Sequence, residues 1–211
     1  MVRGEGMTYF KYGEREIEYL KKSDEILGRA IDLIGTVRRR VDSDVFQSLI
    51  SSIISQQIST KAALTIKGRL LALLGEITPR NIDKTSIEEI QKCGMSHRKA
   101  GYIKGIGEAA ISGDIDFNNL SNLEDQEIIK ELTKLKGVGE WTVEMLLIHS
   151  LERPDILSYK DLAIRRGIIS LYGLTGLSKE EFEVYRGRYS PYGTTASIYI
   201  WEIASRNKKI G

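Results

Sequence analysis

The stretch that decides the fold covers eight residues and runs Leu135-Lys136-Gly137-Val138-Gly139-Glu140-Trp141-Thr142. Two glycines around one valine predict a tight turn between two helical patterns. Because glycine has no Cβ, such a turn can bring backbone N–H groups against a phosphate. Asp161 follows Gly139 by 22 residues, at the start of another helical pattern. A phosphate-binding turn followed by a single acid indicates an enzyme that works on a nucleic acid backbone.

The overall composition permits this interpretation but does not by itself point to it. The chain has 211 residues, 41% of them hydrophobic, which is enough for one large domain or two tightly joined small ones. Its formal net charge is only +2, so a nucleic-acid surface would need clustered positive charge. Arg38-Arg39-Arg40 and Arg165-Arg166 are two such clusters.

Several classes of protein are excluded. One cysteine, Cys93, rules out a disulfide framework or a four-cysteine iron–sulfur cluster. Two histidines, His97 and His149, cannot form a zinc site alone, and no cofactor is expected to be required. The chain has no apolar run long enough for a membrane span and no apolar signal-peptide region at its start, so we expect a soluble, intracellular protein without a membrane partner.

The hydrophobic periodicity is helical nearly everywhere. In the segment after Asp44, apolar pairs recur every four residues, with Ser51, Ser52 and Ser55 on the other side. No strand alternation is found, which predicts an all-α domain of about ten helices. The clearer helices are expected over residues 60–74, from Ser96 to Ala110, from Asp161 to about Gly173, and from Ser190-Pro191 onward.

Four segments in this order resemble the helix-hairpin-helix Gly/Pro-Asp superfamily of DNA glycosylases, and most of all its 3-methyladenine DNA glycosylase II branch. The segments are residues 52–63, the hairpin at 135–142, the aspartate segment at 161–167 and the stretch from Tyr189 to Trp201. The resemblance implies a helix-hairpin-helix glycosylase fold with two helical subdomains and the active-site cleft between them. We expect residues 1–22 to form an N-terminal arm that is at most partly ordered. Residues 23–211 are expected to form a single glycosylase domain, with the hairpin at about 125–150.

The activity implied by this resemblance is removal of alkylated purines such as 3-methyladenine from double-stranded DNA by a monomer. Such an enzyme must rotate the nucleotide out of the duplex, which needs a backbone grip, a group to fill the gap and a pocket for the base. The backbone grip matches Gly137, Gly139, Glu140 and Thr142, with Arg165 as a further phosphate contact. The carbonyls that would hold a monovalent cation, Na⁺ or K⁺, match Thr133, Leu135 and Val138. The gap-filling residues match Gln57 and Ile58, and the base pocket matches Trp141, Trp201, Met145 and Tyr192.

Each of these roles has a plainer alternative. A glycine turn can simply join two helices, and Ile58 and both tryptophans can belong to the core. Gln57 can be solvated, and Arg165 can pair with acids on the surface. The aromatic pocket is favoured because electron-rich rings attract the positive charge of alkylated purines.

Asp161 matches the catalytic acid, which would stabilise an oxocarbenium-like sugar or activate the attacking water. An aspartate that only caps a helix is the alternative, and the two roles are compatible. Asp155 is a rival candidate for the catalytic acid, but it lies outside the matching segment. Where strand-nicking relatives carry a lysine, this chain has Trp141, so an intact abasic site is the expected product. A non-catalytic DNA-binding module and a glycosylase for oxidised or deaminated bases remain as alternatives.

Overall fold

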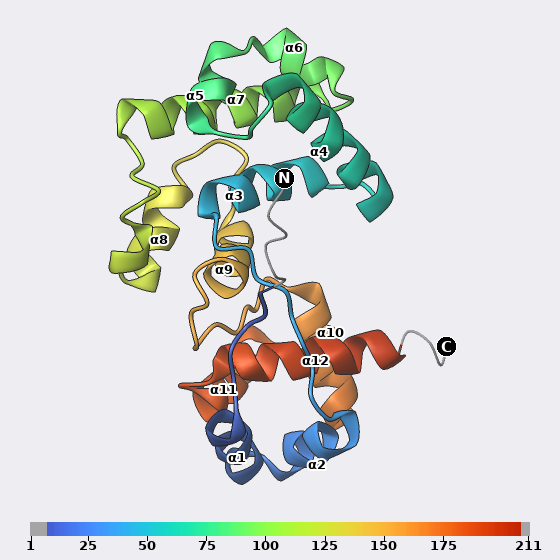
Figure 1. Cartoon of the computed structure of the whole chain (residues 1–211). Coiled ribbons are helices and arrows are strands. Elements are labelled where there is room, and N and C mark those ends of the chain that lie inside the picture. The colour runs from blue at the N-terminus through green and yellow to red at the C-terminus, as the bar shows by residue number, and fades with distance from the viewer. Residues whose placement is uncertain (1–7, 208–211) are drawn as a thin grey trace. The chain divides into compact units, whose positions relative to one another are not determined.

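The computed structural model describes residues 8–207, which form twelve α-helices, one 3₁₀-helix and no strand (Figure 1). Within this range Tyr9 and Arg40 pair in an isolated antiparallel bridge. The predicted all-α class is confirmed, with more helices than the ten expected. Residues 1–7 of the predicted arm lie outside the described part. None of the helices described is both long enough and apolar enough to cross a bilayer.

The helices divide into two units, which we call unit 1 (residues 1–41 and 147–211) and unit 2 (residues 42–146). Unit 1 is therefore built from both ends of the chain. Its helices are α1 (Glu14–Ser23), α2 (Glu25–Ile34), α10 (Leu162–Tyr172), α11 (Lys179–Tyr189) and α12 (Gly193–Asn207). Unit 2 holds α3 (Val45–Ser55), α4 (Thr60–Leu74), α5 (Pro79–Lys84), α6 (Ile87–Lys92), α7 (His97–Ser112), the 3₁₀-helix η1 (Leu120–Asn122) and α8 (Asp125–Leu132). The boundary falls inside α9 (Glu140–His149).

Most helix starts are set by a short polar side chain directly before the helix. The hydroxyl of Ser59 accepts the Ala62 amide at 3.3 Å, and Ser96 accepts the Lys99 amide at 3.3 Å. At Ser86 the helix start is reinforced by the capping box that the sequence predicts, since the Glu89 carboxylate accepts the Ser86 amide in return. Each such cap is worth about 1 kcal/mol, so these local signals fix the helix boundaries.

The last helix begins later than the sequence predicts. Ser190 is the C-cap of α11, and α12 starts at Gly193, so Ser190-Pro191 lies in the connection and not in the first turn. The reason is the carboxylate of Asp155, which is distant in the sequence. Asp155 Oδ1 accepts the Gly193 amide at 3.0 Å, and Asp155 Oδ2 accepts the Ser190 hydroxyl at 2.6 Å. These two bonds place the start of α12 at Gly193.

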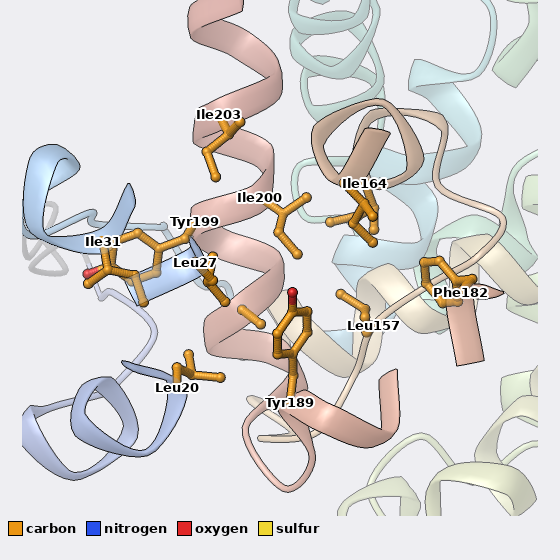
Figure 2. Close-up of a cluster of buried hydrophobic side chains, with 12 residues drawn as sticks. Leu20, Leu27, Ile31, Leu157, Ile164, Phe182, Tyr189, Tyr199, Ile200 and Ile203 are labelled. Carbon is orange, nitrogen blue, oxygen red and sulfur yellow. The ribbon is translucent and has the colours of Figure 1, made fainter. Parts of the chain in front are cut away.

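The core of unit 1 joins the first helices of the chain to the last ones. Figure 2 shows Leu20, Leu27 and Ile31 of α1 and α2 in the same cluster as Tyr199 and Ile203 of α12, all of them buried. Burying each aliphatic side chain of this size contributes roughly 1.5–3 kcal/mol. The same cluster includes Leu157, Ile164, Ile168, Phe182, Tyr189, Ala196 and Ile200. Because Ile164 and Ile168 belong to α10, this core also fixes the helix that carries Asp161 at its start.

A buried polar network holds α2 to the C-terminal helices. Asp24 caps α2 by accepting the Leu27 amide at 2.9 Å, and its other oxygen accepts the Tyr172 hydroxyl at 2.6 Å and Arg188 at 2.5 Å. Tyr172 and Tyr189 also share a hydrogen bond of 2.5 Å. Burial alone would raise the pKa of Asp24, but these three donors outweigh it and hold that pKa below its ordinary value.

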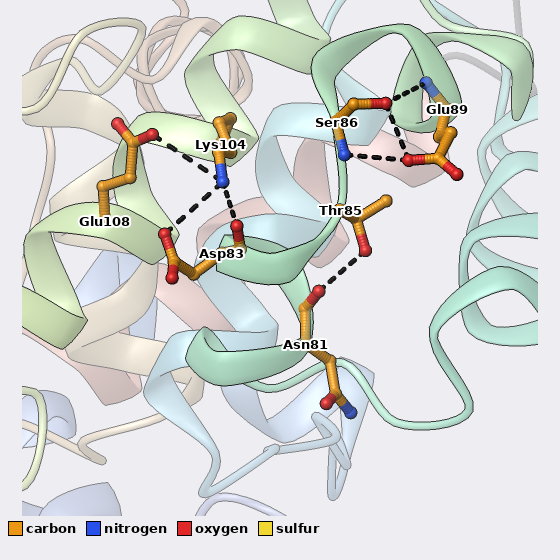
Figure 3. Close-up of polar contacts among 7 residues, drawn as sticks. All are labelled: Asn81, Asp83, Thr85, Ser86, Glu89, Lys104 and Glu108. Carbon is orange, nitrogen blue, oxygen red and sulfur yellow. Dashed lines mark hydrogen bonds and ion pairs between the residues drawn. The ribbon is translucent and has the colours of Figure 1, made fainter.

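Unit 2 is organised around α7, which packs against α3, α5 and α6. Gly107 lets α5 approach closely, since a Cβ there would lie 2.6 Å from Cγ2 of Ile82. Lys104, one turn earlier, donates to the Asp83 carbonyl and lies 3.4 Å from the Asp83 carboxylate and 3.8 Å from Glu108 (Figure 3). The long helix α7 is thus fixed within unit 2 by both packing and charge.

Candidate functional site

The hairpin predicted at residues 135–142 forms between α8 and α9. Thr133 ends α8, the Val138 amide donates to the Leu135 carbonyl at 3.1 Å, and α9 begins at Glu140. We call residues 133–139 the α8–α9 hairpin. The first amides of a helix have no acceptor within the helix itself, and they carry the positive end of its dipole. The start of α9 therefore has the chemistry of an anion site.

The two glycines of the hairpin do different things. Gly137 has φ +86°, and a Cβ there would lie 2.2 Å from Cδ2 of Tyr102, so only glycine fits. A Cβ on Gly139 would have no neighbour within 4 Å. Gly137 is thus required by the protein interior, whereas Gly139 leaves open space next to the first turn of α9. Thr142, also matched to the backbone grip, is buried, and Glu140 is partly exposed.

The turn matched to gap filling joins α3 to α4 and comprises residues 56–58, here called the α3–α4 turn. Gln57 is exposed and has φ +60°, a backbone conformation that residues with a Cβ rarely adopt. Ile58 is 38% exposed, so it is not an ordinary core residue. Both side chains are accessible to a partner, and their role in DNA stays a prediction.

A cavity of about 540 Å³ in unit 2 brings together four of the predicted site residues: Gln57, Trp141, Thr142 and Met145. Trp141 is 44% exposed, which is unusual for so large an apolar ring and agrees with a surface that receives a ligand. The volume lies within the roughly 300–1,000 Å³ typical of small-molecule sites. The remaining lining residues are Ser51, Ser52, Ser55 and Gln56.

The serine wall of this cavity was not predicted as part of a site. The periodicity of α3 correctly separates its serines from the buried apolar stripe, but assigns them no role. Ser51 and Ser55 each donate to a carbonyl one turn earlier, both at 2.8 Å. The signal that could have revealed them is a run of three small polar residues on one face, directly before the α3–α4 turn.

Asp161 is the N-cap of α10 in unit 1. Its Oδ1 accepts the Ala163 amide at 2.7 Å and the Ile164 amide at 2.9 Å, and the residue is only 6% exposed. Two amides on one oxygen fix the carboxylate in place, and the start of a helix favours its negative charge. The rival acid Asp155 is committed to Ser190 and Gly193 at the start of α12.

Trp201 and Tyr192, predicted for the base pocket, also belong to unit 1. The ring of Trp201 stacks on His149 with centroids 5.7 Å apart, and the guanidinium of Arg39 lies 5.7 Å from the same ring. Burial lowers the pKa of His149, and the charge of Arg39 acts in the same direction. Tyr192 packs edge-on against Tyr19 at 5.1 Å. A base that reached Trp201 would share the ring with these neighbours.

Arg165, matched to a phosphate contact, lies against an aromatic ring. The Arg165 guanidinium lies 5.1 Å from the Tyr159 ring, and its Nε is buried without a hydrogen-bond partner.

Of the three carbonyls matched to a monovalent cation, that of Leu135 already accepts the Val138 amide, although a carbonyl retains a second lone pair. Within residues 8–207 no group of three or more His, Cys, Asp or Glu side chains is arranged as a metal site.

Known proteins match both the sequence and the fold. The model of the HhH-GPD superfamily base excision DNA repair proteins matches residues 50–188, which include the hairpin and Asp161. DNA-3-methyladenine glycosylase 1 of Schizosaccharomyces pombe is 35% identical over 192 residues, covering 87% of this chain and 84% of that protein.

Solved structures agree. A DNA-3-methyladenine glycosidase from Bacillus halodurans has a TM-score of 0.86 and 36% identity, covering 96% of this chain and 95% of that one. A 3-methyladenine DNA glycosylase of Schizosaccharomyces pombe in complex with abasic DNA has a TM-score of 0.77 and 34% identity, covering 89% and 95%. The chain therefore belongs to the HhH-GPD superfamily of base excision DNA repair proteins.

Proposed function

We propose that this protein is a DNA glycosylase that hydrolyses the bond between deoxyribose and an alkylated purine, such as 3-methyladenine, in double-stranded DNA. The observation that carries the proposal is Asp161, a carboxylate fixed by two amides inside the segment that the family match covers. The names of the similar proteins from Schizosaccharomyces pombe and Bacillus halodurans support the alkylated base as the substrate. The abasic DNA bound to one of them supports DNA as the partner.

In this mechanism the α8–α9 hairpin holds a phosphate while Gln57 fills the gap left by the rotated nucleotide. Trp141 and Met145 then contact the base in the cavity of unit 2. An alkylated purine that carries a positive charge is attracted to the Trp141 ring by roughly 0.5–2 kcal/mol, an advantage that neutral normal bases lack. The serine hydroxyls of α3 offer hydrogen bonds to the edge of the base.

Bond cleavage depends on the positive charge of the base before the bond breaks and of the sugar as it breaks. When the C1′–N bond breaks, its electron pair leaves with the base, which neutralises an alkylated cationic purine, and the sugar becomes an oxocarbenium ion. The Asp161 carboxylate stabilises that positive charge. Water adds to C1′ and loses a proton, leaving an intact abasic site. Trp141 occupies the position at which strand-nicking relatives carry a lysine, so no Schiff base with the sugar forms.

The protein acts as a monomer in this proposal, and the hairpin carbonyls of Thr133, Leu135 and Val138 hold Na⁺ or K⁺ as a structural ion. Replacing these ions with choline should weaken DNA binding without changing the thermal unfolding temperature in the absence of DNA. Equal DNA affinity in both salts would exclude the cation.

The test of the activity is a set of duplex oligonucleotides, each with one lesion, scored for hot-alkali cleavage after incubation with the protein. Asp161→Asn should slow base release roughly 10²–10³-fold, the usual cost of losing one group that stabilises developing charge. Asparagine caps helices about as well as aspartate, so thermal stability and DNA affinity should stay close to wild type. Glu180→Gln, an exposed carboxylate in the same unit, is the matched control.

Each alternative has its own outcome. A protein that binds the duplexes but releases no base from any lesion is a non-catalytic DNA-binding module. Release of hypoxanthine or an oxidised base in preference to 3-methyladenine would assign the serine-walled cavity to neutral bases. Trapping of a covalent protein–DNA adduct by borohydride would contradict the assignment of Trp141.

A further inference from the structure

The backbone just before Gln57 is held by a lysine from another helix. Lys99 Nζ on α7 donates to the Ile54 carbonyl at 2.8 Å and to the Gln56 carbonyl. The last carbonyls of a helix have no donor within it, and a positive charge there also suits the helix dipole. Lys99 therefore closes the C-terminal end of α3. Its burial lowers its pKa, yet both contacts are ones that an ammonium group makes well.

The side chain of Gln56 links this turn directly to the α8–α9 hairpin. Its Nε2 donates to the Gly137 carbonyl at 3.0 Å, across 81 positions of sequence. The two turns predicted to touch DNA are thus joined by a hydrogen bond from the residue that precedes Gln57. Both residues of this bond lie within unit 2, as do Ile54, Lys99 and Tyr102.

The same helix that supplies Lys99 also supports the hairpin. Tyr102, three residues further along α7, lies directly against Gly137, where a Cβ would come within 2.2 Å of its ring. Residues three apart on a helix share a face, so α7 presents one residue to each turn. Lys99 holds the α3–α4 turn and Tyr102 holds the α8–α9 hairpin.

Gln57 itself has the unfavourable backbone conformation, with φ +60°. Such a conformation persists in a non-glycine residue when the surrounding structure imposes it. Here the preceding residue is fixed at its carbonyl by Lys99 and at its side chain by the hairpin. On the other side, the Ile58 amide donates to Ser55 at 3.4 Å, and Ser59 caps α4. The exposed side chain of Gln57 therefore projects from a braced backbone.

We propose that Gln56, Lys99 and Tyr102 are positioning residues that hold Gln57 at a fixed place relative to the phosphate-binding hairpin. Gripping the backbone and filling the gap are then one event, because the gap-filling residue cannot move independently of the grip. A braced Gln57 also loses little conformational freedom when it enters the base stack. The inference rests on the proposed function and adds to it the residues that couple two of its parts.

The first test uses Gln56→Met, which keeps the length of the side chain but removes the amide that reaches Gly137. Single-turnover base release is compared on a fully paired duplex and on one in which the lesion sits in a bulge, already unstacked. Loss of the hydrogen bond should slow release about three- to tenfold on the paired duplex. On the bulge the loss should be smaller, because little rotation remains to be driven. A loss that Gln56 caused as a lining residue of the cavity would instead be equal on both duplexes. Gln91→Met, at an exposed glutamine on α6, is the control.

Lys99 is tested by Lys99→Met, with Lys99→Arg as the conservative variant and Lys92→Met as the control for lost charge. Lys99→Met should likewise slow base release more on the paired duplex than on the bulged one. Lys99→Arg should restore most of the rate on the paired duplex. Thermal unfolding of every variant separates a folded protein with a loosened turn from one that has lost its fold.

The second test asks whether Gln56 acts through Gln57. If it does, Gln56→Met should cost little once Gln57→Ala has been made, so the two effects are not additive. Equal loss on both duplexes, or additive effects in the double variant, would overturn the proposal. If the wild-type protein releases no base, the proposed function fails on its own. The role of Gln56 is then tested without base release, by the fluorescence of a 2-aminopurine placed opposite an abasic site. Gln56→Met should reduce the fluorescence change on protein binding by the same factor as Gln57→Ala.

Discussion

The two glycines of the α8–α9 hairpin give the sharpest prediction, because alanine should fail at each for a different reason. At Gly137 the substitution meets two costs. A residue with a Cβ at φ +86° is disfavoured by about 1–2 kcal/mol. The Cβ would also lie 2.2 Å from the Tyr102 ring, and forcing such an overlap costs about 1–3 kcal/mol.

Together these terms predict that Gly137→Ala lowers the free energy of unfolding by about 2–5 kcal/mol. For a chain of this size that corresponds to a fall of roughly 4–20 °C in the melting temperature. At Gly139 nothing lies within 4 Å of a Cβ, so Gly139→Ala should change the free energy of unfolding by less than about 1 kcal/mol. Its methyl group instead stands where a phosphate would approach, and DNA affinity should fall at least about tenfold, as for a lost hydrogen bond to a charged group.

Circular dichroism melting and fluorescence anisotropy with a labelled duplex carrying an abasic analogue measure the two effects. Gly105→Ala on α7, where a Cβ also meets nothing within 4 Å, is the control for both. If Gly139→Ala melts as early as Gly137→Ala, or binds the duplex as tightly as the wild-type protein, the two glycines do not have these separate roles.

Three further predictions concern the cavity, the buried acid and the packing of unit 1. Trp141→Ala should slow release of a cationic lesion about 2- to 30-fold and of neutral hypoxanthine less, measured on paired duplexes; equal losses would contradict a charge-dependent role for the ring. Asp24 has a pKa below its ordinary value of 3.8, so its contribution to stability is complete above that pH and is lost as the pH falls through the lower folded-state value. Asp24→Asn should therefore flatten the fall in melting temperature below pH 4, and an unchanged slope would show that other groups cause it. Gly167→Ala places a Cβ 2.5 Å from the Ile200 carbonyl on α12 and should cost about 1–3 kcal/mol in urea unfolding, a loss that a tolerated variant would disprove.

The parts of the fold that the sequence predicts are those set by local chemistry. Ser59, Ser86 and Ser96 begin helices where their side chains precede an apolar periodicity, and Asp161 does the same. The start of α12 could not be predicted this way. Its determinant is Asp155, which acts across 38 positions, and no local pattern reveals such a partner.

The candidate site also depends on contacts between residues that are distant in the sequence. The resemblance matches Trp141 to the base pocket and Gln57 to gap filling, but it does not predict that α3 contributes serines to the same cavity. The stacking of Trp201 with His149 and Arg39 likewise depends on how distant segments pack. Trp201 and Trp141 are both predicted for the base pocket, whereas in the structure Trp201 stacks on His149 and Trp141 lines the cavity of unit 2.

The discontinuous make-up of unit 1 has a consequence for biosynthesis. Residues 42–146 are a complete unit once they have left the ribosome, so unit 2 can fold while translation continues. The helices α1 and α2 emerge earlier but bury Leu20, Leu27 and Ile31 against helices that are made after unit 2. At roughly 5–20 residues per second, residues 147–207 take about 3–12 s to be synthesised. During that interval the nascent chain exposes an apolar surface of the kind that chaperones recognise.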